Sequence, residues 1–271
     1  MEWHDEGLLL TAHPHGEGSA IIDVLTAAHG RHAGLVRGGQ SNKMTATLQP
    51  GTQVSLEWRA RLEEHLGNYK VEPLRARAAV LMEDRAALAA FNAMVALVVE
   101  FVPEREPDFD LYEATQDLVD ILCERPRDWP GTYVRWEAAF LATLGFGLDF
   151  TRCAATGVRG DLAYVSPRTG RAVSREAGGP FAEKLLPLPP FLTGEGVVTM
   201  SGVRLGMRMV GWFFENRVCP AMERERLPEA RFRLMQVFET YALAPRPSDT
   251  KAAATTLEAP TDAWSRRLGL A

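Results

Sequence analysis

The segment TQVSLEWR, residues 52–59, limits most strongly what the first part of this chain can fold into. Val54, Leu56 and Trp58 fall on one face and the polar residues between them fall on the other, which is the period of a half-buried β-strand. Four more short segments have strand character, with glycine-rich turns among them: 7–14, 20–27, 32–39 and 66–74. The pattern predicts a five-stranded barrel or sandwich over residues 1–79. A barrel suits so short a segment because closure leaves no exposed strand edge.

Helical spacing replaces strand spacing after residue 80. Apolar residues recur every three or four positions in five segments: 88–102, 111–122, 128–144, 201–213 and 232–243. Asp128, with Pro130 in the next turn, is the expected N-cap of the third helix, and Ser201 is the expected N-cap of the fourth. We therefore predict a multidomain α+β protein. It has a barrel at 1–79, a mostly α-helical domain at 80–243 and a flexible tail at 244–271.

Acidic residues are absent between Asp23 and Glu57, although the whole chain has a formal charge of -5. This segment includes the glycine-rich stretch HGRHAGLVRGGQSNK at 29–43. Basic side chains on one face of a small barrel form the usual groove for single-stranded nucleic acid. We predict that the basic residues in and beside the segment contact such a strand: Arg31, Arg37, Lys43, Arg59 and Arg61. The alternative is that they are ordinary surface residues. Arg59 and Arg61 are expected to share the outward face of the strand that carries Trp58.

Motifs for catalysis are missing from the sequence. It contains no phosphate-binding G-x-x-x-x-G-K-[ST] loop, no G-x-G-x-x-G, no G-x-S-x-G and no H-E-x-x-H. The pairs His13/His15 and His29/His32 have the spacing of metal ligands, but solvated histidines in loops and at strand ends are the simpler interpretation. A metal-dependent hydrolase is therefore the weakest hypothesis. We predict no catalytic residue, no metal and no cofactor.

Cysteine usage and hydropathy bear on the compartment. The three cysteines are far apart, which argues against a disulfide framework, and no apolar run approaches the ~20 residues of a membrane span. These features predict a cytoplasmic protein.

Cys153 begins a loop whose spacing is that of a zinc site. The segment CAATG at 153–157 is followed by GRAVSREAG at 170–178, and the other three ligand positions hold Thr156, Ser174 and Ala177. One thiol cannot hold a structural zinc, which needs four ligands. We therefore predict that the loop at 148–180 lacks the metal.

Several longer segments, in this order and spacing, resemble the RecO family of bacterial recombination mediators. They are GEGSAIIDVLTAAHGRHAGLVRGG (16–39), LQPG (48–51), YVRWEAAFLATLGFGLDFTRCAATG (133–157), YVSPRTGRAVS (164–174) and LLPLPPFL (185–192). The resemblance covers nearly all of residues 1–243. It implies an N-terminal OB-fold, a helical domain and an inserted zinc-finger-like loop, here of the branch without the metal.

The same resemblance implies a function without catalytic turnover. Members bind single- and double-stranded DNA, anneal complementary strands and act with RecR to load RecA onto DNA that is covered by single-strand-binding protein. A protein of this kind is expected in the cytoplasm, in association with the nucleoid.

A second arginine-rich region, 152–175, has Asp161 as its one acidic residue. Arg168 and Arg171 in this region are predicted to extend the DNA path. The region is alternatively a receptor for the acidic C-terminal tail of single-strand-binding protein. The competing hypothesis for the whole chain is a protein-only adaptor, in which the acidic helices of residues 81–150 keep DNA away.

Overall fold

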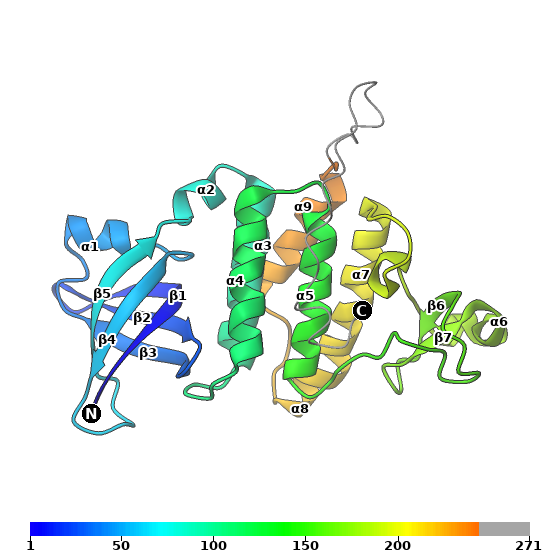
Figure 1. Ribbon diagram of the computed structural model, residues 1–271, viewed down its shortest axis with the longest axis horizontal. Helices are drawn as coiled ribbons and strands as arrows, with labels where there is room; N and C mark the ends of the chain where they lie inside the picture. The colour runs from blue at the N-terminus through cyan, green and yellow to red at the C-terminus, as the bar shows by residue number, and fades with distance from the viewer. Residues whose placement is uncertain (244–271) are drawn as a thin grey trace. The chain divides into compact units, whose positions relative to one another are not determined.

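The computed structural model describes residues 1–243, and its first five strands close into a barrel in the order β1, β2, β3, β5, β4 (Figure 1). The strands are β1 (Glu2–His15), β2 (Ser19–Thr26), β3 (Gly30–Val36), β4 (Gln53–Arg59) and β5 (Asn68–Arg75). β3 and β5 run parallel, and the other neighbours are antiparallel. A small closed five-stranded barrel of mixed direction is the OB-fold architecture. The predicted five-stranded barrel is thus confirmed.

β1 is longer than the sequence pattern predicts. Its first half pairs with β4, from Glu2 opposite Arg59 to Leu8 opposite Gln53, and its second half pairs with β2. A register shift between Leu9 and Thr11 interrupts the β1–β2 ladder. The predicted strand began at residue 7 because residues 2–6 are mostly polar and are held in the strand by a tertiary contact with β4.

The barrel core consists of inward side chains from all five strands, together with Leu48, which lies between α1 and β4. The buried residues are Leu9, Ala20, Ile22, Val24, Val36, Leu48, Val54, Leu56, Trp58, Tyr69 and Val71. Gly34 on β3 lies directly under the ring of Tyr69, and a Cβ atom at residue 34 would be 2.3 Å from a ring carbon. Since real Cβ atoms do not approach so closely, glycine at this position is what allows the tyrosine ring to cross the strand.

A short helix, α1 (Asn42–Thr47), connects β3 to β4 and was not predicted from the sequence. The Ser41 hydroxyl caps it by accepting a hydrogen bond from the Met44 amide. Leu48, which follows the helix, is 4% exposed and belongs to the barrel core, and Met44 packs against this core. Figure 1 shows α1 and the N-terminus at opposite ends of the barrel.

Three helices follow the barrel: α2 (Ala78–Met82), α3 (Arg85–Phe101) and α4 (Phe109–Glu124). Asp84 caps α3, since its carboxylate accepts hydrogen bonds from the amides of Ala86 and Ala87 at 2.8 Å. The chain changes from strand to helix between Arg75 and Ala78, next to the predicted boundary at residue 80. The boundary between the two compact units of the chain lies later in the sequence, however, because residues 1–123 form the first unit.

The second unit begins at Glu124 and contains four helices of the described chain, α5 (Trp129–Thr143), α7 (Met200–Phe213), α8 (Cys219–Ala221) and α9 (Glu229–Thr240), together with the short helix α6 (Arg175–Gly178). A turn of π-helix, residues 214–218, joins α7 to α8. Between α5 and α7 lies a sheet of β6 (Leu162–Val165), β7 (Ala172–Ser174) and β8 (Leu186–Pro187). One 3-10 turn, at 179–184, precedes β8, and a second, at 190–193, follows it. The predicted mostly helical second part is confirmed.

Two predicted helix caps differ from the structure. The side chain that caps α7 is Thr199, whose hydroxyl accepts a hydrogen bond from the Gly202 amide, so the prediction of Ser201 was wrong by two residues. Asp128 does occupy the N-cap position of α5, but its side chain makes no capping bond. Pro130 in the first turn removes one of the amides that would otherwise need an acceptor.

A buried ion pair ties α9 to α5. The side chains of Arg231 and Glu137 are 2% and 0% exposed, with the Nη2 atom of Arg231 2.8 Å from Oε2 of Glu137. Tyr133 donates to the same carboxylate at 3.0 Å. Burial, and after it the charge of Glu137, raises the pKa of this tyrosine well above its usual value.

None of the helices within residues 1–243 has the length and the hydrophobicity that a membrane span requires. The predicted tail at 244–271 lies outside those residues.

Candidate nucleic-acid interface on the barrel

Three of the five predicted barrel cations keep an uncompensated charge. Arg37 follows β3, Lys43 lies on α1, and Arg61 lies in the loop after β4; all three are exposed. In the part of the chain that the structure describes, none of them is within ion-pair distance of a carboxylate. The Nε atom of Arg37 donates a hydrogen bond to the side-chain oxygen of Asn68 at 3.1 Å, which orients the guanidinium without neutralising it.

Arg61 is not on the strand face where the sequence analysis placed it. β4 ends at Arg59, and Arg61 belongs to the loop 60–67 that leads to β5. The prediction of a shared outward face was therefore wrong, because the strand ends two residues earlier.

Arg31 is engaged inside the fold. Its side chain is 13% exposed, and its guanidinium bonds to Asp23 at 2.6 Å and to the carbonyl oxygen of Val102 at 2.8 Å. Glu104 lies 3.6 Å away. Burial raises the pKa of Asp23, and the neighbouring Arg31 offsets only part of that effect. The Arg31 charge therefore serves first to compensate Asp23.

Arg59 is exposed but paired. One of its terminal nitrogens lies 2.8 Å from Glu2 and 2.7 Å from Glu57. In the β4–β5 ladder Arg59 lies opposite Asn68, the residue whose side chain bonds to Arg37. Two carboxylates offset the charge of Arg59, whereas no carboxylate of residues 1–243 offsets that of Arg37.

The two predicted residues of the second unit lie on the loop between β6 and β7. Arg168 is exposed, and its backbone carbonyl accepts a hydrogen bond from Arg217 at 2.7 Å. Arg171 is half-buried and lies 3.4 Å from Asp149. Of this pair, Arg168 has the charge that no described carboxylate compensates.

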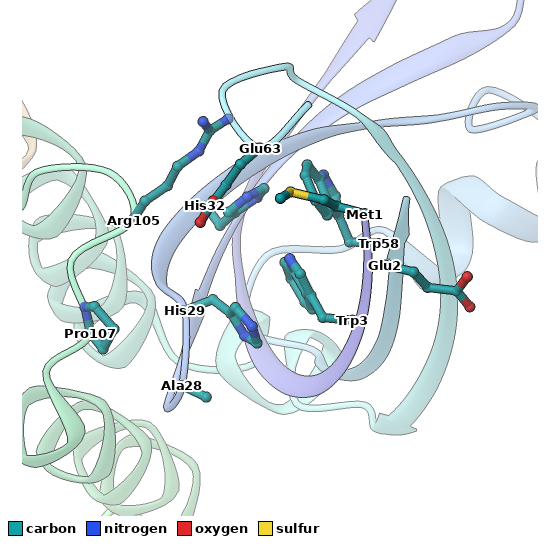
Figure 2. A pocket seen from close by; sticks show the side chains of 10 residues that line it. All are labelled: Met1, Glu2, Trp3, Ala28, His29, His32, Trp58, Glu63, Arg105 and Pro107. Atoms are coloured by element: carbon teal, nitrogen blue, oxygen red, sulfur yellow. The ribbon is translucent and has the colours of Figure 1, made fainter. Parts of the chain in front are cut away.

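An aromatic cavity that the sequence analysis did not identify opens at the N-terminal end of the barrel (Figure 2). Its volume is about 440 Å³. The Trp3 ring stacks on His29, with centroids 3.9 Å apart and planes 10° apart, and it also stacks on Trp58 at 5.6 Å. Figure 2 shows Trp3, Trp58 and Met1 on one side of the cavity and Arg105 with Pro107 on the other. We call this space the barrel-mouth cavity.

Deeper in the barrel-mouth cavity, His32 is 3% exposed and its Nδ1 atom lies 2.8 Å from the Tyr69 hydroxyl. Burial, followed by the charges of Arg105 and His29, lowers the pKa of His32 to about 4. His32 is therefore a neutral hydrogen-bonding group at physiological pH. The burial of His32 could not be predicted from the sequence, in which it is one of two closely spaced histidines.

Among the described residues, neither of the two closely spaced histidine pairs belongs to a cluster of three potential metal ligands. His29 bonds to Asp5 at 3.0 Å and His32 to Tyr69, while His13 and His15 are exposed on β1. Among the described residues, three potential metal ligands gather only at Glu2, His4 and Glu57. Arg59 already bonds to both of these carboxylates, which argues against a cation there.

Hydrogen bonds connect the degenerate ligand positions of the loop at 148–180. The Ser174 amide donates to the sulfur of Cys153 at 3.3 Å, and the Ser174 hydroxyl accepts from the Ala177 amide at 3.4 Å. Burial alone would raise the pKa of Cys153, but hydrogen bonds from Ser174, Thr156 and the Ala155 amide lower it to about 6. That the loop lacks the metal stays a prediction.

Comparison with known proteins covers almost the whole described chain. Residues 1–77 match the family described as "Recombination protein O N terminal", and residues 82–226 match "Recombination protein O C terminal". A DNA repair protein RecO of Cereibacter sphaeroides is 53% identical over 237 residues, which is 88% of this chain and 98% of that relative. The RecO of a Ruegeria species is 51% identical over 235 residues (87% and 97%), and that of Rhodospirillum rubrum is 46% identical over 252 residues (91% and 100%).

Proposed function

Because the chain belongs to the RecO family, we propose that it is a DNA-binding mediator of recombination and repair. In this proposal the barrel holds single- or double-stranded DNA by its phosphates, and the protein anneals complementary strands. It then acts with RecR to load RecA onto single strands that are covered by single-strand-binding protein. It does so without catalytic turnover, in the cytoplasm and in association with the nucleoid.

The observation that carries the proposal is the set of uncompensated cations on an OB-fold barrel: Arg37, Lys43 and Arg61. Phosphate contacts need charges that are free to exchange counterions for DNA, and a guanidinium that is already paired with a carboxylate contributes less. Arg31 and Arg59 are therefore secondary candidates. A backbone-binding site of this kind positions the strand and does not read its sequence.

The second unit is the proposed place for contacts with proteins. Arg168 presents an uncompensated charge on the β6–β7 loop, which suits either a continuation of the DNA path or the acidic C-terminal tail of single-strand-binding protein. Competition between a peptide of that tail and DNA, for wild-type protein and Arg168→Glu, separates these two uses. If the peptide binds both proteins equally, Arg168 is not part of its receptor.

Fluorescence anisotropy with a labelled oligonucleotide tests the proposal directly. We expect binding of unstructured single strands without sequence preference, together with accelerated pairing of two complementary strands. The alternative, a protein-only adaptor, predicts no binding to DNA in this assay while RecR is still retained. That combination of results would refute the proposed DNA-binding role.

A further inference from the structure

The barrel-mouth cavity is a built site that binding to phosphates does not use. Its lining carries two formal positive charges, the N-terminal ammonium and Arg105, and two formal negative charges, Glu2 and Glu63. The ammonium already donates to the carbonyl oxygen of Ala60 at 2.7 Å. With no net charge and with rings along one side, the cavity favours a neutral planar group over a phosphate.

Two donors at this cavity bond to no acceptor within residues 1–243. The Nε atom of Arg105 is buried and makes no hydrogen bond, although a terminal nitrogen of the same guanidinium bonds to the His65 carbonyl at 3.0 Å. No described residue accepts a hydrogen bond from the Trp3 indole. In Figure 2 the indole nitrogen lies on the side of the Trp3 ring that faces His32 and Trp58. Of the two, only the Nε atom of Arg105 is buried, and a buried donor without a partner is costly, so an acceptor supplied by a ligand would relieve that cost.

The backbone holds Arg105 in this position against its preference. Arg105 has a φ of 65°, in the left-handed region that non-glycine residues seldom adopt. Its amide is fixed by a hydrogen bond to the Arg31 carbonyl at 2.8 Å. Strain that the surrounding fold maintains is often found where a side chain must be presented to a ligand.

We propose that the barrel-mouth cavity accepts one unstacked base of a bound strand, with Arg105 and the Trp3 indole as donors to its ring oxygen or nitrogen atoms. This inference rests on the proposed function, since the strand must first be held by its phosphates. Nucleobases present both a π-face and hydrogen-bond acceptors, and the aromatic wall and the two donors match these features. An aromatic side chain of a partner protein would fill the same space but offers fewer acceptors, since phenylalanine and tryptophan have none and tyrosine has one hydroxyl oxygen. The base is therefore the better fit.

The test compares two 15-mers with the same phosphate backbone, one fully abasic and one abasic except for a single central thymine. Anisotropy titrations measure the affinity ratio of the two strands. Stacking of one base contributes about 1–3 kcal/mol, so wild-type protein should bind the thymine-bearing strand about 5- to 160-fold more tightly. Arg105→Lys keeps the charge but removes the Nε donor, and Trp3→Leu removes the ring. Both variants should lower the ratio toward one while leaving affinity for the abasic strand unchanged.

The control variant is Arg37→Gln, which should weaken both strands equally and keep the ratio. Thermal melting of each variant verifies that it is folded. A wild-type ratio of one, or an unchanged ratio in the folded Arg105→Lys protein, would overturn the base site while leaving DNA binding intact. Failure of wild-type protein to bind either strand would overturn the proposed function and the base site with it. Binding of N-acetyl-tryptophanamide that is lost in Trp3→Leu, without a thymine advantage, would identify a protein side chain as the occupant instead.

Discussion

Substitution of Arg37 by glutamine should weaken DNA binding by a predictable amount. Each phosphate contact with a single strand contributes about 0.7 to the slope of log K against log salt concentration. At 0.1 M salt, one decade below 1 M, loss of one contact lowers K by about 0.7 log units, or about fivefold. Among the described residues, the Arg37 guanidinium bonds only to the neutral side chain of Asn68, so its whole charge is available for a contact. Arg37→Gln should therefore lower the affinity about fivefold at 0.1 M salt and reduce the slope by about 0.7.

The matched control is Arg59→Gln, which removes the same charge from the same barrel. Because Glu2 and Glu57 already offset that charge, we expect a change in affinity of less than about twofold, well below one phosphate contact. The assay is fluorescence anisotropy of a labelled oligonucleotide at four salt concentrations, with three different base sequences. If Arg59→Gln costs as much as Arg37→Gln, then pairing with carboxylates does not decide which cations contact DNA, and the reasoning is refuted.

Three further predictions concern the fold. The pKa of His32 falls from 6.5 to about 4 on folding, so between these pH values the unfolded chain binds more protons than the folded one. The contribution of His32 to the free energy of unfolding is therefore fully present above pH 6.5, and that free energy decreases by about 2 kcal/mol between pH 7 and pH 5. Urea denaturation at both pH values measures this loss, and His32→Gln should remove most of it. Glu137→Gln leaves Arg231 buried without a counter-charge and should cost about 3–5 kcal/mol in the same assay at pH 7; a loss below about 1 kcal/mol would contradict the assigned role of the pair. Gly34→Ala should destabilise the barrel by more than about 1 kcal/mol, because the new methyl group meets the Tyr69 ring, and a neutral effect would contradict the close packing.

Local patterns predicted the strands and most helices because those elements are determined by the spacing of apolar residues. The alternation at 52–59 appears in the structure as β4, with Val54, Leu56 and Trp58 inside the barrel. The short helix α1 escaped prediction because none of its six residues is buried. Its position depends on the Ser41 cap and on Leu48, which follows it.

The candidate site was harder to predict because an acid-free stretch of sequence is not an acid-free surface. Asp23 bounds the stretch yet pairs with Arg31 inside it, and Glu2 reaches Arg59 from the opposite end of the barrel sequence. These pairings arise from the β2–β3 and β1–β4 ladders, which composition does not reveal. The barrel-mouth cavity depends on the same long-range contacts. Trp3, His29 and Arg105 are distant in sequence, and no local motif connects them.

The central claim, that the barrel binds the phosphate backbone through its uncompensated cations, is tested most directly by the salt dependence of binding to single-stranded DNA. Three contacts, by Arg37, Lys43 and Arg61, predict a slope of log K against log salt concentration of about -2. A slope near -3.5 would indicate five contacts and would bring Arg31 and Arg59 back into the interface. A slope near zero would contradict the account, because it would show that no phosphate is neutralised when the strand binds.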